Sequence, residues 1–172
     1  FSNIKINQVS SFAFYNIFEN ITGYFEDISI SLDPGGGGSQ EVFRSVNING
    51  TFKNVKVTNN EPINTFFSTN GGSIFGTYKD IGLASSSAIA AFSCSGLTMS
   101  GIFEDIYLPT SSFAFDSTQD IFGTFSNITV GDVTTSGFMY APSVINGNFS
   151  DIKVGSVASY VFYGGTVEGK FK

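Results

Sequence analysis

A ten-residue phrase recurs along this chain at intervals of 22 to 27 residues. It reads Ile, Val or Met, then any residue, Gly, any residue, an aromatic residue, any residue, Asn or Asp, Ile or Val, any residue, and an aliphatic residue. The full copies are ITGYFEDISI (21–30), INGTFKNVKV (48–57), IFGTYKDIGL (74–83), MSGIFEDIYL (99–108), IFGTFSNITV (121–130) and INGNFSDIKV (145–154). FSNIKI (1–6) matches the end of a further copy, and VEGKF (167–171) matches the start of another. Self-similarity at a fixed period indicates stacked repeats, and helical repeats need longer units rich in helix formers.

Each phrase has the alternation of a β-strand, interrupted once. In the copy at 121–130, Ile121 and Phe125 are four residues apart. Because successive side chains of a strand point to opposite faces, these two share one face. Ile128 and Val130 also alternate, but out of phase with that pair. Asn127 absorbs the phase change, and Asn or Asp tolerates the left-handed backbone conformation. We therefore predict a one-residue corner at this position, with all four aliphatic and aromatic side chains facing inward.

A third strand rich in aromatic residues precedes most phrases. Its copies are SFAFYN (11–16), NTFFS (64–68), SSFAFD (111–116), SGFMYA (136–141) and SYVFYG (159–164), and AIAAF (88–92) is an apolar variant. All of these except NTFFS and AIAAF have rings at positions i and i+2. The sequence thus predicts an all-β fold, a right-handed parallel β-helix (β-solenoid) of about seven coils of 22–27 residues, with three short strands per coil. We expect residues 1–172 to form one domain, an excerpt of a longer repeat protein, with a flexible glycine-rich loop at 32–40.

Stacked coils bring equivalent residues into columns along the axis. The expected aromatic stack is Phe25, Phe52, Tyr78, Phe103, Phe125, Phe149 and Phe171. The expected ladder of Asn and Asp corners is Asn3, Asp27, Asn54, Asp80, Asp105, Asn127 and Asp151. We also expect the recurrent glycine to leave a groove beside the aromatic stack, into which the rings lean.

The corner side chains are predicted to be structural, each accepting a hydrogen bond from a backbone N–H of the adjacent coil. Asp80 and Asp105 are neighbours in the ladder, and like charges directly opposite one another are unfavourable. At least one of them should therefore point outward or have a raised pKa. A calcium ladder is the rival interpretation, but the alternating acids that calcium sites use are missing.

Composition excludes several classes of function. The net charge is −6, and the eight Lys and Arg residues form no basic stripe, which disfavours nucleic acid as a partner. No apolar run is long enough to span a membrane, so membrane insertion is not expected. With one cysteine (Cys94) and no histidine, an internal disulfide is impossible and cysteine- or histidine-based metal sites are excluded. We expect no cofactor and no metal ion.

Catalytic residues are not expected either. The carboxylate pairs Glu26 with Asp27 and Glu104 with Asp105 are adjacent along the chain, so their side chains should diverge. Glu26 and Glu104 lie three coils apart, roughly 14 Å by strand spacing, beyond the separation of about 5–9.5 Å used in glycoside hydrolysis. Asp116, Asp120 and Asp132 are expected in loops, and Arg44 has no obvious partner.

Four Asn-x-Ser/Thr sequons occur, at Asn20, Asn49, Asn127 and Asn148. If the protein passes through a eukaryotic secretory route, Asn49 and Asn148 are the plausible glycosylation sites, because they flank the glycine and should face outward. Asn127 lies at a corner and is expected to be inaccessible.

The segments SFAF…FGTFSNITV (112–130) and SYVFYGG…EGKF (159–171) resemble repeats of viral proteins from giant viruses and large marine phages. Those proteins iterate a serine-aromatic-x-Phe segment followed by Gly-Thr-Phe-x-Asn-Val. Many have Cys after the Asn, whereas this chain has Ile or Val there. The resemblance implies a β-helical fibre, spike or adhesin on a particle or cell surface, and it carries over no catalytic residue.

The expected function is therefore a non-catalytic structural or adhesive segment of a fibre, spike or surface appendage, on a virion or outside the cell. A carbohydrate-binding or carbohydrate-cleaving β-helix of the tailspike type is the alternative. An ice-binding solenoid is disfavoured, because the outward position after each glycine varies too much. Expected partners are further coils of the same chain or copies of itself, together with other surface or capsid proteins or glycans.

Overall fold

The computed structural model describes residues 1–34, 40–58, 61, 63–84, 87–135 and 137–172. Within these ranges all regular structure is β-strand. The strands are β1 (Ser2–Val9), β2 (Phe12–Leu32), β3 (Glu41–Val57), β4 (Ile63–Thr69), β5 (Ile74–Leu83), β6 (Ser87–Cys94), β7 (Thr98–Ser117), β8 (Asp120–Val133), β9 (Gly137–Val157) and β10 (Tyr160–Phe171). Of the predicted loop at 32–40, residues 35–39 lie outside the described ranges, and Leu32 is the last residue of β2.

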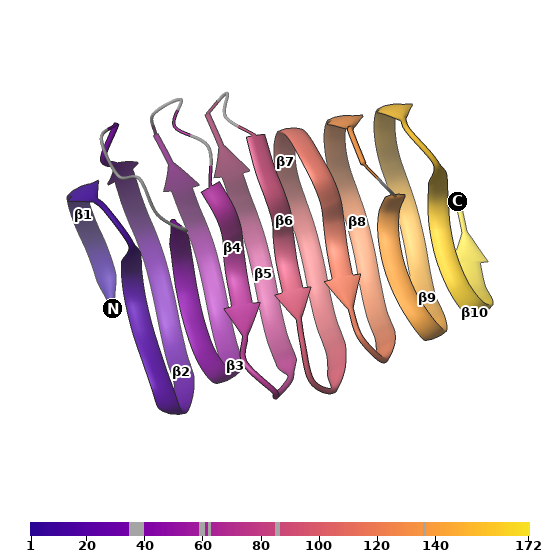
Figure 1. Ribbon diagram of the computed structural model, residues 1–172, viewed down its shortest axis with the longest axis horizontal. Helices are drawn as coiled ribbons and strands as arrows, with labels where there is room; N and C mark the ends of the chain where they lie inside the picture. Colours follow the sequence, from indigo (N-terminus) through magenta and orange to yellow (C-terminus); the bar gives the residue numbers. More distant parts are fainter. Residues whose placement is uncertain (35–39, 59–60, 62, 85–86, 136) are drawn as a thin grey trace.

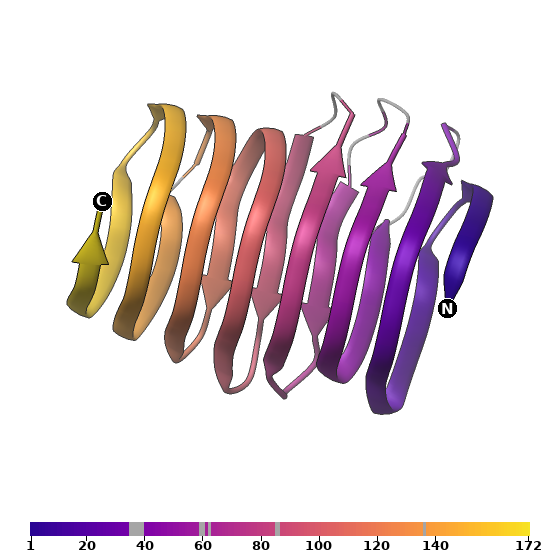
Figure 2. The same cartoon turned by 180° about the vertical axis from the view of Figure 1, so that it is seen from behind.

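The strands wind into a parallel β-solenoid of about six turns, slightly fewer than the seven expected from the sequence. Every strand pairing is parallel, and each coil pairs with the next along the axis. In Figure 1 the near strands run downward and the far strands run upward as the chain advances from left to right, which makes the winding right-handed. The opposite view in Figure 2 shows the same sense of winding. The predicted fold class is confirmed.

The register confirms the copies read from the sequence. The phrase glycines pair in one unbroken series through six consecutive steps: Gly23, Gly50, Gly76, Gly101, Gly123, Gly147 and Gly169. Equivalent phrase residues therefore pair in every coil, although the coils differ in length. The differences in length fall in the connections between phrases.

The corner residues have the backbone that the phase change requires. All seven predicted Asn and Asp residues have φ between 49° and 55°, in the left-handed region. In the copy at 121–130, Phe125 and Ile128 are three residues apart, yet both are fully buried. A single left-handed residue between two strands thus turns both strands' apolar faces inward. Gln8 has the same conformation at φ 58°, which the repeat does not predict.

The phrase glycine serves close backbone approach rather than a groove for rings. At Gly123, φ is +142°, and a Cβ atom would lie 2.1 Å from the carbonyl oxygen of Gly101 in the preceding coil. Gly76, Gly101 and Gly169 likewise combine a positive φ with a Cβ position 2.0–2.1 Å from the preceding glycine's oxygen. The space beside the column is filled by backbone, so the expectation of a groove there is wrong.

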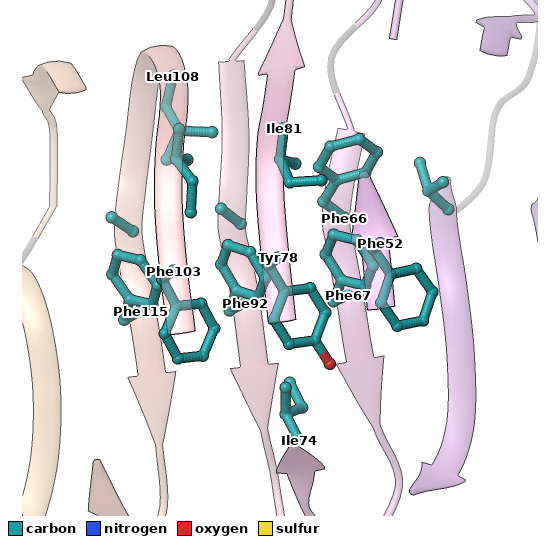
Figure 3. Close-up of a cluster of buried hydrophobic side chains, with 14 of the residues drawn as sticks. Phe52, Phe66, Phe67, Ile74, Tyr78, Ile81, Phe92, Phe103, Leu108 and Phe115 are labelled. Atoms are coloured by element: carbon teal, nitrogen blue, oxygen red, sulfur yellow. The ribbon is translucent and has the colours of Figure 1, made fainter. Parts of the chain in front are cut away.

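Two interlocked columns of rings run through the interior, beside aliphatic side chains such as Ile81 and Leu108 (Figure 3). In the first column, ring centroids are 4.7–5.2 Å apart and the planes lie within 12° of parallel; its members are the seven predicted residues and Phe1. The second column has spacings of 4.6–5.1 Å and consists of Phe14, Phe43, Phe67, Phe92 and Phe115. Rings of one column meet rings of the other edge-to-face at 4.9–5.7 Å. Stacked and edge-to-face geometries are both favourable for aromatic pairs.

The second column changes at the coil that contains Met139. The register places Met139 opposite Phe115, and Phe138 instead makes edge-to-face contacts with Phe115 and Phe162. Of the two rings that the spacing picks out in this coil, Phe138 is fully buried, whereas Tyr140 lies on the outer side and stacks on Tyr163. Ala114, which directly precedes Phe115, is also fully buried.

Candidate functional site

Lysines and carboxylates on the outer side of the phrase strands pair between coils. Lys53 Nζ lies 2.6 Å from Glu26 Oε1, and Lys79 Nζ lies 3.0 Å from Glu104 Oε2. Hydrogen bonds to Glu26 and Glu104 raise the pKa of the Lys53 and Lys79 ammonium groups, respectively. All of these side chains are at least one-quarter exposed, so solvent screens the pairs and they contribute little to stability.

The corner side chains point outward into solvent. Asp80 is 49% exposed and lies 3.3 Å from Lys56; Asp105 is 36% exposed and lies 3.6 Å from Lys79. This is the outward placement predicted for the two neighbouring acids. Asn127 donates to Asp105 Oδ1 at 2.7 Å, so here amide and carboxylate pair directly rather than through the backbone.

The hydrogen bond to a neighbouring coil's backbone occurs at other aspartates. Asp120 Oδ1 accepts from the Val144 N–H at 3.1 Å, and Asp132 Oδ1 accepts from the Ser156 N–H at 3.3 Å. Hydrogen bonds from Ser156 also lower the pKa of Asp132. The expectation that these aspartates and Asp116 lie in loops is wrong, because Asp116 belongs to β7 and the other two to β8.

A groove crosses the outer face where β3, β5 and β7 run side by side. The register places Lys56, Gly82 and Tyr107 at equivalent positions of three successive coils, so a residue without a side chain lies between two long ones. The resulting hollow has a volume of about 450 Å³, and Asp80 and Asp105 also line it. We call this hollow the Gly82 groove.

A second hollow continues the Gly82 groove along the corner ladder. It has a volume of about 360 Å³ and shares Asp80, Asp105 and Tyr107 with the first. Its other polar lining includes Lys79 and Asn127. The two hollows together form a strip with one half-exposed aromatic ring, ammonium groups and carboxylates.

The acidic groups of this strip are paired with lysines. Asp80 and Asp105 are exposed, and each lies beside a lysine of the same strip. The predicted pair Glu104 and Asp105 shares one lysine, Lys79, and Glu26 of the other predicted pair contacts Lys53. Across the part of the chain that the structure describes, no three His, Cys, Asp or Glu residues gather into a possible metal site.

One residue of the repeat marks this groove, although the phrase pattern hides it. At the position of Gly82 the other copies have Ser29, Lys56, Tyr107, Thr129 and Lys153. Gly82 is itself buried, whereas its equivalents Lys56 and Tyr107 are exposed, and the repeat does not require a glycine at this variable position. It marks a place where side-chain volume is missing.

Arg44 has a partner that sequence reasoning missed. Its Nη1 lies 2.8 Å from Oε1 of Glu41, which is buried on the third strand of its coil. Burial raises the pKa of the Glu41 carboxyl, against the opposing effect of Arg44. Arg44 also lies 5.8 Å from the ring centre of Phe12. The segment EVFRS (41–45) lacks the serine-aromatic pattern of the other third strands, so that pattern did not identify it as one.

The sequons at Asn49 and Asn148 are exposed, as predicted from their position beside the glycine. Asn127 is also exposed, which contradicts the expectation that a corner residue is inaccessible. Its side-chain amide is engaged with Asp105.

The fold and its repeat define the chain as a parallel β-solenoid repeat protein. No protein-family model, curated protein or solved structure matches it. In the ranges that the structure covers, there is no helix of the length and apolarity needed to cross a bilayer.

Proposed function

We propose that the chain is a non-catalytic structural or adhesive β-solenoid segment of a fibre, spike or other surface appendage, located on a virion or outside the cell. The observation that carries this proposal is the pair of interlocked ring columns. They run through the interior of the stack, where Phe52, Phe103 and Phe125 are fully buried. An interior packed with rings supports a stiff rod and has no space for a substrate.

The hydrogen bonding of the coils supports the same function. Each phrase strand is paired on both sides by parallel neighbours over most of the stack, as β5 is by β3 and β7. Bending such a rod requires many ladder bonds and ring contacts to change together. The outer positions remain free to vary, and the phrase does vary there. A constant interior with a variable exterior suits a scaffold that presents a surface.

Immunogold electron microscopy tests the location. Antibodies against the purified chain are applied to intact particles or cells of the source, with antibody pre-absorbed on the chain as control. We expect label on surface projections. Label confined to the interior of cells or particles would contradict the proposal.

A second assay tests the absence of catalysis. The purified chain is incubated with neutral and acidic polysaccharides, and released reducing ends are measured over time. We expect no release above the buffer control. Sustained release that disappears in the double variant Asp80→Asn with Asp105→Asn would show instead that the chain cleaves carbohydrate.

The carbohydrate-binding alternative is favoured by one observation, the Gly82 groove. A hollow of about 450 Å³ lies within the usual range for small-molecule sites, roughly 300–1,000 Å³. Binding at this groove is compatible with an adhesive role. The chemistry of its lining indicates which ligands it favours.

A further inference from the structure

We propose that the Gly82 groove binds a neutral oligosaccharide. The inference names a ligand class for the adhesive part of the proposed function and rests on that part. Three observations carry it: a glycine that the fold does not require, a half-exposed aromatic ring beside it, and carboxylates that are each paired with a lysine.

Gly82 differs from the glycines that the coil geometry demands. A Cβ atom at Gly101 would lie 2.1 Å from a backbone oxygen of the preceding coil. At Gly82 the nearest atoms to a Cβ are the Tyr107 carbonyl oxygen at 3.9 Å and Lys56 Cγ at 4.0 Å, which are ordinary contact distances. The φ of Gly82 also does not lie in the positive region that L-residues rarely adopt, so a side chain here causes no backbone strain. The structure therefore accepts a side chain at this position, and its lack opens the groove.

Tyr107 provides the apolar surface of the groove. It is 50% exposed and occupies the coil after Gly82, so part of its ring is accessible. An aromatic ring with a hydroxyl group offers an apolar face together with a polar tip. Sugar rings likewise combine a face of C–H groups with a rim of hydroxyl groups. A sugar that covers the Tyr107 ring leaves its hydroxyl groups directed at the surrounding side chains.

The polar groups of the groove match hydroxyl groups better than a charged ligand. Asp80 and Asp105 accept hydrogen bonds, and Lys56 in the groove and Lys79 in the adjoining second hollow donate them. Lys56 lies near Asp80, and Lys79 lies near Asp105, so the charges offset each other. An anion would meet the carboxylates of Asp80 and Asp105, and a cation would meet the ammonium group of Lys56 and, in the adjoining hollow, that of Lys79. A neutral ligand with many hydroxyl groups uses both kinds of partner without an unpaired charge.

Titration by ¹H–¹⁵N NMR tests this inference. Cellohexaose, laminarihexaose and maltohexaose are the neutral probes, and a galacturonic acid hexamer is the anionic probe. We expect at least one neutral hexamer to bind, with shifts centred on the Gly82 and Tyr107 amides. Gly82→Val fills the groove and Tyr107→Ala removes its ring, and each should weaken binding about tenfold or more.

The controls match the two variants by position and exposure. Ser29→Val changes the same register position two coils away from Gly82. Tyr24→Ala removes a tyrosine that is 49% exposed, compared with 50% for Tyr107. Neither residue lines the groove, so both variants should bind as the original chain does. Circular dichroism confirms that each variant folds, and Tyr107→Ala carries the test if Gly82→Val does not fold.

Three results would overturn the inference: no neutral hexamer binds, only the anionic hexamer binds, or the groove variants and the controls bind equally. None of these bears on the location of the chain, which immunogold labelling measures. Label on internal structures, by contrast, would refute the proposed function without affecting sugar binding. The two proposals therefore fail in distinguishable ways.

Discussion

Replacing Phe103 with alanine tests whether the ring columns hold the solenoid together. Phe103 is fully buried and contacts four rings. It stacks on Tyr78 at 5.2 Å and on Phe125 at 4.9 Å. It also meets Phe92 at 5.1 Å and Phe115 at 5.3 Å edge-to-face. Truncation removes all four contacts at once and leaves a cavity in the middle of the stack.

The expected loss of unfolding free energy is about 5 kcal/mol, at the upper end of the range of roughly 3–5 for buried Phe to Ala. The upper end applies because Phe92 stacks on Phe67 and Phe125 stacks on Phe149, each on the side away from Phe103, so neither can easily close the cavity. Phe103→Leu keeps most of the apolar area and loses only the ring geometry. At about 0.5 kcal/mol for each of the four pairs, it should cost about 2 kcal/mol.

Urea unfolding followed by circular dichroism measures both variants. With an m-value of about 2 kcal/mol/M, the midpoint for Phe103→Ala should fall by about 2.5 M. Phe18→Ala is the control, because Phe18 is 87% exposed and its loss should change stability by less than about 0.5 kcal/mol. A loss below about 2 kcal/mol for Phe103→Ala, or one equal to that of Phe18→Ala, would refute the reasoning.

Three further predictions concern the backbone and pH. Gly123→Ala should cost about 3 kcal/mol in the same urea assay, from its φ of +142° and the oxygen of the preceding coil, whereas Gly82→Ala should be nearly neutral; equal losses would contradict the contrast. Asn127→Ala should cost about 1–2 kcal/mol for a left-handed alanine, and Asn127→Gly should cost less; the reverse order would argue against the corner. Burial raises the pKa of Asp116, so its stabilising contribution is complete below the ordinary carboxyl pKa of about 4 and is lost as the pH rises through the raised value. The melting temperature should therefore fall as the pH rises above about 4, and Asp116→Asn should reduce that fall; an unchanged slope would exclude this residue as a cause.

The features that the sequence predicts best are those that constrain the backbone. The corner at Asn127 was predictable because a strand cannot change phase without one unusual residue, and few residue types accept that conformation. The pairing of Gly101 with Gly123 follows from their place in the phrase. Both signals are local to one copy and recur in the others, so the copies reinforce one another.

The features that were missed depend on which side chains meet across coils. The partner of Arg44 and the position of Met139 each depend on the register to a single residue, in a third strand whose sequence varies. The Gly82 groove is hidden for a different reason. It arises from Lys56 before it and Tyr107 after it, and the three are neighbours only once the coils are stacked.

Coils this alike are interchangeable neighbours while the chain folds. Tyr78 packs on Phe103 in the native stack, but the strand of Phe125 offers the same ring, glycine and corner residue at matching positions. During folding, a coil can therefore pair with a later coil and leave the coil between them as a loop. The entropic cost of closing that longer loop is small, because it rises only slowly with loop length. Phe138 and Met139 give one turn an interior unlike that of its neighbours, so it packs well in only one place. A stack that misplaces this turn loses the contacts of Phe138 with Phe115 and Phe162, whereas turns with matching ring positions carry no such penalty.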